Sequence, residues 1–165
     1  MLRLKQKLTK DLKTSRDKTF FKKIDKVINN LIGHKLITFT VIDENLKYCE
    51  RIYSNNNKIY PILGQKKMPK NIWSTKVLKN KQHFVCKSKN DIKKIFFDYD
   101  TIFSIGCGSI INLLVLFQSK PIGTINILNK ENYYSNKHIK KIDFITIFLI
   151  PFFIKHQLKM KNKIL

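Results

Sequence analysis

Apolar residues in the first third of the chain follow two different spacings. Between residues 4 and 32 they recur every three or four positions with lysines between them, which predicts amphipathic helix, most clearly over Phe20–Ile32. Gly33 is a typical helix stop. The next runs, Leu36–Ile42 and Lys47–Tyr53, are rich in β-branched and aromatic residues and flank a polar turn. They predict a β-hairpin.

The middle of the chain is broken into short elements. Residues 54–68 are rich in Asn, Pro and Gly, which predicts a loop. Pro69 suits the start of a helix through Leu78, and His83–Cys86 predicts a short strand. Ser88 is expected to cap a helical turn, and Asp98–Phe103 to form another.

One uncharged stretch, Thr101–Phe117, raises the question of a membrane span. It is too short for about 20 apolar residues, and glycines interrupt it. Two apolar runs, Ser109–Phe117 and Ile122–Leu128, are joined by a QSKP turn and predict an antiparallel hairpin in a buried sheet. A later apolar run, Ile142–Ile154, contains an aspartate and a proline. We therefore expect no membrane span.

The end of the chain predicts a long helix. Ser135 or Asn136 caps it, it runs to about Lys159, and Pro151 should kink it. Adjacent hairpins favour a mainly antiparallel sheet, so the fold class is α/β in the α+β sense. The N- and C-terminal helices are expected to pack on one face of that sheet.

The net charge of +22 changes this picture little, although such a charge is typical of nucleic-acid partners. Only three of the 33 basic residues are arginines, and the lysines are spread along the whole chain. Base reading and bidentate phosphate contacts favour arginine. We therefore expect a solvated surface and no specific nucleic-acid partner. A basic protein that binds nucleic acid or membrane surfaces through its N-terminal helix is kept as a third alternative.

The cysteines number three, at Cys49, Cys86 and Cys107. An odd count without close spacing indicates neither a disulfide framework nor a zinc site. A reducing cytoplasm fits best, and no metal site is predicted.

The chain resembles a GAF domain from about residue 24 to 155. The last third carries the strongest match, and features of short stand-alone bacterial GAF proteins occur earlier. The matching segments are Arg51–Ser54 (RIYS), Tyr60–Gly64 (YPILG), Trp73, Phe97–Asp98, Ile105–Asn112 (IGCGSIIN), Pro121–Leu128 (PIGTINIL) and Tyr133–Ser135 (YYS).

The resemblance implies a six-stranded antiparallel sheet with helices on both faces. It also implies a small-molecule pocket roofed by residues 54–106, and dimerisation through the terminal helices. Residues 1–23 would be a basic helical extension, 24–160 the domain and 161–165 a tail. The expected function is sensory or regulatory binding of an unidentified ligand. No effector domain is expected to be attached, so the output would be a change of dimer state or an effector protein acting in trans.

The candidate ligand-binding residues combine aromatic groups with a few placed polar groups, the usual make-up of a pocket. The amides Asn112 and Asn126 are the most informative, because each interrupts an apolar strand, where a buried amide needs partners. The alternatives are that the aromatics are simple core and that the amides face outward or form hydrogen bonds across strands. The full set is Tyr53, Tyr60, Trp73, Phe97, Cys107, Ser109, Asn112 and Asn126.

Known GAF ligands identify no cofactor for this sequence. Asn129-Lys130 matches the start of the cyclic-nucleotide pattern, but its acidic pair is missing. No cysteine has an adjacent histidine for a bilin, and the four histidines are scattered. The enzyme alternative resembles free methionine-(R)-sulfoxide reductases. Cys107 would be the nucleophile and Cys86 the resolving thiol, although the cysteine spacing of that family is not reproduced.

Overall fold

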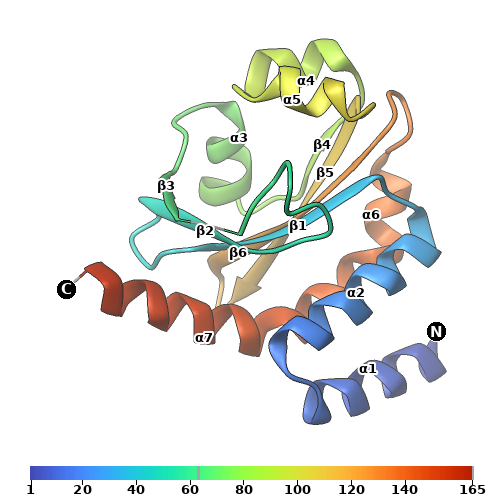
Figure 1. Cartoon of the computed structure of the whole chain (residues 1–165), viewed down its shortest axis with the longest axis vertical. Helices are drawn as coiled ribbons and strands as arrows, with labels where there is room; N and C mark the ends of the chain where they lie inside the picture. Colours follow the sequence, from blue (N-terminus) through green and yellow to red (C-terminus); the bar gives the residue numbers. More distant parts are fainter. Residues whose placement is uncertain (63, 165) are drawn as a thin grey trace.

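The computed structural model describes residues 1–62 and 64–164, and their strands form one six-stranded antiparallel sheet (Figure 1). The strands are β1 (Leu36–Ile42), β2 (Tyr48–Ser54), β3 (Gln65–Lys67), β4 (Phe84–Cys86), β5 (Ser109–Phe117) and β6 (Lys120–Asn129). Their order across the sheet is β3-β2-β1-β6-β5-β4. The two predicted hairpins are therefore neighbours, joined where β1 pairs with β6. The predicted fold class is confirmed.

Helices cover both faces of the sheet (Figure 1). The terminal ones share one face, as expected, and are α1 (Leu2–Thr14), α2 (Asp17–Ile32), α6 (Asn136–Ile142), the 3-10 turn η2 (Asp143–Ile145) and α7 (Thr146–Ile164). Short helices roof the other face and are α3 (Ile72–Ser74), the π-helical turn η1 (Thr75–Lys79), α4 (Lys89–Ile95) and α5 (Tyr99–Ser104).

Strand alternation divides the interior into two layers. Successive side chains point to opposite faces of a sheet. Phe39 of β1 and Ile125 of β6 therefore join the large core under the terminal helices. Their neighbours Thr40 and Asn126 point to the side of the short helices. This second side holds a smaller apolar cluster and, next to it, the polar side chains described below.

A β-bulge in β2 changes the side on which its residues lie. Phe39 pairs with Tyr53, but the next residue, Thr40, pairs with Arg51, so Ile52 is the extra residue. Such a bulge resets the alternation. Arg51 therefore points toward the short helices, whereas Tyr53 lies among the terminal-helix core, with its ring 4.8 Å from that of Phe39. Its hydroxyl donates a hydrogen bond of 2.6 Å to Asp25.

Several element boundaries differ from those predicted. The helix expected over residues 4–32 is broken at Ser15, whose backbone is extended. The loop predicted at 54–68 contains the edge strand β3. The final helix is interrupted by η2, and Pro151 lies inside α7. The predicted cap Ser88 is confirmed, because its hydroxyl accepts a hydrogen bond from the backbone N–H of Asp91.

No helix in the described part of the chain has both the length and the apolarity needed to cross a membrane. The predicted helical extension, domain and tail remain predictions.

Acidification is expected to lower the stability of the fold through His156, which lies between α2 and α7. His156 of α7 lies 3.1 Å from a carboxylate oxygen of Asp17. Burial lowers the pKa of His156, although Asp17 acts in the opposite direction. Because the folded pKa is the lower one, the unfolded chain binds more protons near and below the usual histidine pKa. Stability should therefore fall between about pH 7 and 5. Urea unfolding across this range measures it, and a slope unchanged in His156→Gln would contradict the assignment.

Candidate ligand pocket

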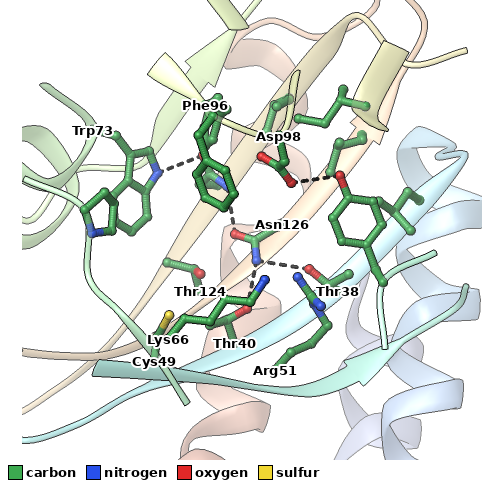
Figure 2. Close-up of a pocket in the computed structure, with 18 of the residues that line it drawn as sticks. Thr38, Thr40, Cys49, Arg51, Lys66, Trp73, Phe96, Asp98, Thr124 and Asn126 are labelled. Carbon is green, nitrogen blue, oxygen red and sulfur yellow. Dashed lines mark hydrogen bonds between the residues drawn. The ribbon is translucent and has the colours of Figure 1, made fainter. Parts of the chain in front are cut away.

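A cavity of about 180 Å³ lies between the sheet and the short helices (Figure 2). Its floor is made of alternate residues of neighbouring strands, and its roof comes from the loops and helices between residues 60 and 102. The floor residues are Leu36, Thr38, Thr40, Ile42, Cys49, Arg51, Lys66, Ile110, Asn112, Thr124, Asn126 and Leu128. The roof residues are Tyr60, Met68, Pro69, Trp73, Phe96, Phe97, Asp98 and Ile102.

A chain of hydrogen bonds runs from the roof across the floor. The indole N–H of Trp73 donates to Oδ1 of Asn112 at 2.9 Å. The amide of Asn112 then donates to Oδ1 of Asn126 at 2.7 Å. The amide of Asn126 donates to both Thr38 and Thr40, each at 3.1 Å. An indole can only donate, so it fixes the orientation of both amides and the direction of the whole chain. We call this chain the amide relay.

The roof is fixed locally so that Trp73 can begin the relay. Asn71 caps α3, because its Oδ1 accepts from the backbone N–H of Ser74 and its own N–H donates to the Ser74 hydroxyl. Its side-chain amide also donates to the carbonyl of Ile95 at 3.0 Å, at the end of α4. One side chain therefore joins both parts of the roof above the sheet, which holds the indole in place.

The other end of the cavity is charged. The guanidinium of Arg51 lies 4.9 Å from the ring centre of Tyr60, and its Nη1 donates to the carbonyl of Pro61 at 2.9 Å. Burial lowers the pKa of Arg51. The hydroxyl of Tyr60 donates to Asp98 at 2.9 Å. Burial and the Asp98 carboxylate raise the pKa of Tyr60, so this hydroxyl keeps its proton.

Comparison of the sequence with protein-family models and with curated proteins gives no match, but solved structures resemble the fold closely. The GAF domain of a phosphoenolpyruvate-protein phosphotransferase from Coxiella burnetii has a TM-score of 0.70 at 10% identity, covering 98% of this chain and 96% of that chain. The GAF domain of a two-component sensor histidine kinase from Bacillus halodurans has a TM-score of 0.65 at 14% identity, covering 86% and 99%. The chain has the fold of a GAF domain.

Another neighbour with this fold is an enzyme. A type II free methionine-R-sulfoxide reductase from Thermoplasma acidophilum has a TM-score of 0.58 at 12% identity, covering 80% of this chain and 94% of that chain. The identities are too low to carry function, so these likenesses establish the GAF fold alone. They confirm the resemblance found in the sequence at that level.

On the GAF fold, five of the eight predicted site residues line the cavity. They are Tyr60, Trp73, Phe97, Asn112 and Asn126. The two amides are partners of one another, as buried amides require. Phe97 is unusual, because 85% of its side-chain and backbone surface is exposed although it borders the cavity. It therefore lies at the mouth.

The other three predicted residues lie elsewhere. Tyr53 is on the opposite side of the sheet because of the bulge at Ile52. Cys107 is fully buried in the apolar cluster beside the cavity and does not line it. The hydroxyl of Ser109 donates to the carbonyl of Lys130 at 2.7 Å, at the start of β5.

Sequence reasoning missed the threonines and the cations of the floor. Thr38 and Thr40 belong to a strand whose apolar positions alternate with them, and this period-2 pattern was the available signal. Arg51 and Lys66 were counted with the surface charge. Lys66 of β3 pairs with Cys49 of β2, and Cys49 lies on the same face of β2 as Arg51. This pairing, which the sequence does not reveal, brings both cations to one side of the sheet.

The accessible thiol should be Cys49, which is half-buried and lines the cavity. Burial raises the pKa of Cys107 to about 11 and that of Cys86 to about 12. It raises the pKa of Cys49 as well, but Lys66 and Arg51 oppose this. Iodoacetamide at neutral pH should label Cys49 roughly tenfold faster than the others, because thiolate fraction and access control the rate. Peptide mapping measures the order, and Cys107 reacting first would contradict it.

Proposed function

We propose that the protein is a small-molecule-binding regulatory module built on the GAF fold. The observation that carries the proposal is the amide relay, whose residues all line one cavity from its roof to its floor. Buried polar groups are costly unless they are hydrogen-bonded, and a folded core has little use for them. A mostly apolar cavity with a few placed polar groups is the usual composition of a binding site.

The size of the cavity limits the ligand. Drug-sized ligands occupy about 300–1,000 Å³. The volume here is about 180 Å³, so the ligand is smaller than a drug-sized compound. This agrees with the incomplete cyclic-nucleotide pattern after residue 129.

Native mass spectrometry of the protein as purified from cells tests the proposal. We expect a fixed extra mass that is lost on denaturation. Trp73→Ala should lose this mass, because the indole begins the relay. Ile72→Ala is the matched control, since Ile72 lies on the same helix, is 55% exposed and does not line the cavity. A Trp73→Ala protein that folds and retains the ligand as tightly as Ile72→Ala would refute the pocket assignment.

A thiol-dependent enzyme is the second candidate, favoured by the reductase among the structural neighbours. Its chemistry needs a thiolate, but burial raises the pKa of Cys107 to about 11 and keeps this thiol protonated at neutral pH. Cys107 also does not line the cavity, so ligand binding is better supported than catalysis by this thiol. Assay of free methionine-(R)-sulfoxide with a thiol reductant, using Cys107→Ser as control, decides between them. Turnover that Cys107→Ser abolishes would favour the enzyme.

The regulatory output is proposed to be a change in homodimerisation or contact with an effector protein in trans. Apolar side chains remain exposed on the terminal helices, where Leu2 is 71%, Ile147 65% and Leu158 54% exposed. One neighbour with this fold is the GAF domain of a two-component sensor histidine kinase, which supports the proposed regulatory role. The three free cysteines support a cytoplasmic location.

Light scattering should give a dimer, and Ile147→Glu should shift it toward monomer.

A further inference from the structure

Two cations face the cavity from neighbouring strands. Cys49 and Arg51 are two residues apart on β2 and share one face. Lys66 of β3 pairs directly with Cys49, and both cations act on the Cys49 thiol. Figure 2 shows Arg51 and Lys66 extending from the sheet toward Asn126 and Thr40. Thr40 is the cross-strand partner of Arg51. The charged end therefore meets the far end of the amide relay.

The region around Arg51, Thr38 and Thr40 has more hydrogen-bond donors than acceptors. Thr38 and Thr40 already accept from Asn126, so each hydroxyl proton remains to be donated. No residue of the described structure accepts it. The Nε of Arg51 is buried and, among the described residues, also lacks an acceptor. Unmet buried donors are unfavourable, and a ligand that brings acceptor oxygens would satisfy them.

The charges around the cavity do not balance either. Arg51 and Lys66 are the cations in its lining, and neither forms a salt bridge with another described residue. Asp98 is the sole carboxylate in the described lining and already accepts from Tyr60. Two positive charges against one negative charge leave room for a single anion. Arg51 is half-buried, so its charge is stabilised by a paired anion, whereas Lys66 is exposed to solvent and adds a second positive charge beside it.

We propose that the cavity binds a small organic monocarboxylate, with its oxygens between Arg51, Lys66 and the hydroxyls of Thr38 and Thr40. Its apolar body would point away from the charged end, toward Trp73 and the aliphatic side chains of Leu128 and Ile110, which line the same cavity. This inference rests on the proposed binding function and adds the chemical class of the ligand. Arginine is suited to this role because its planar fork matches a carboxylate.

The single tryptophan of the chain provides a reporter at the site. The indole N–H of Trp73 donates to Asn112 at the cavity, so its NMR cross-peak is unique and local. We would titrate ¹⁵N-labelled protein with benzoate and with the neutral isostere benzamide, at about 0.15 M salt to screen the exposed lysines. Benzoate should shift the indole peak saturably, with an affinity at least about tenfold above that of benzamide, the ratio expected from one charge-assisted hydrogen bond.

Matched variants separate the site from the general positive surface. Lys66→Met and Arg51→Met should each remove most of the preference for benzoate over benzamide. Lys67→Met changes the net charge by the same amount on the same strand, but Lys67 does not line the cavity, so the preference should persist. Lys66 is exposed, so Lys66→Met should fold. It therefore keeps the test available even if Arg51→Met, which loses the stacking on Tyr60, does not fold.

Each outcome is decisive. Equal affinities for benzoate and benzamide would overturn the carboxylate class and leave the binding module standing. A preference that survives in Lys66→Met and Arg51→Met would place the anion elsewhere and also overturn it. If neither compound shifts the indole peak, the inference is also overturned. The binding function is then tested separately, by whether native mass spectrometry finds a ligand retained by the purified protein.

Discussion

Gly123→Ala is expected to lower the free energy of unfolding by about 3 kcal/mol, at the upper end of the cost of overpacking. Gly123 lies in β6, and a methyl group there would come within 2.4 Å of the Thr40 carbonyl oxygen and 2.5 Å of the Phe153 ring. The first neighbour is backbone in the middle of the sheet, and the second is a fully buried side chain of α7. Neither can move without disturbing the contact between α7 and the sheet. Urea unfolding monitored by circular dichroism measures the loss.

Gly64→Ala is the control for this prediction. Gly64 has a positive φ of 66°, but a methyl group there meets no atom within 4 Å. Its cost should be about 1 kcal/mol, the strain of a left-handed backbone alone. Equal losses in the two variants would mean that the closeness of Phe153 and Thr40 to Gly123 has no energetic weight.

Asn126→Leu is expected to cost about 3 kcal/mol of stability, because it removes three hydrogen bonds and leaves a buried amide without its acceptor. The lost bonds join Asn126 to Asn112, Thr38 and Thr40. Asn112 is 3% exposed and cannot turn to water for a replacement. Thermal and urea unfolding should both show the loss, and benzoate should no longer raise the melting temperature of the variant.

The same substitution at an exposed asparagine controls for the change of residue type. Asn90 lies on the surface of α4, and Asn90→Leu should change stability by less than about 0.5 kcal/mol. An Asn126→Leu protein as stable as Asn90→Leu would show that the amide relay is dispensable for folding. The relay would then matter only for the ligand.

Local patterns were sufficient for the two hairpins. Ser109–Phe117 and Ile122–Leu128 were predicted from two apolar runs with a short polar turn, and β5 and β6 agree closely. Gln118 and Ser119 both have positive φ, as a two-residue hairpin turn requires. The three-residue edge strand β3 was missed because QKK has no apolar pattern and is held by its pairing with β2.

The candidate site was harder to predict, because its parts meet through pairing between distant strands. Asn112 and Asn126 stood out within one hairpin, but Thr38 reaches Asn126 from 88 positions away. A periodic pattern of apolar and polar residues along one segment cannot predict a contact between segments so far apart in the sequence. Tyr53 was predicted to line the site because it is one of the aromatic residues of this part of the chain. The extra residue Ile52 in β2 turns it to the opposite side of the sheet, and such bulges are not visible in the sequence pattern.

The central position of β1 and β6 also affects how the chain is made. β1 ends at residue 42, whereas its inner partner β6 is complete only at residue 129. As the chain leaves the ribosome, the first hairpin has no second strand to cover its inner edge until most of the protein has been synthesised. Pairing over so long a separation is slow. The exposed inner edge of β1 is therefore where a nascent chain of this protein most needs protection from aggregation.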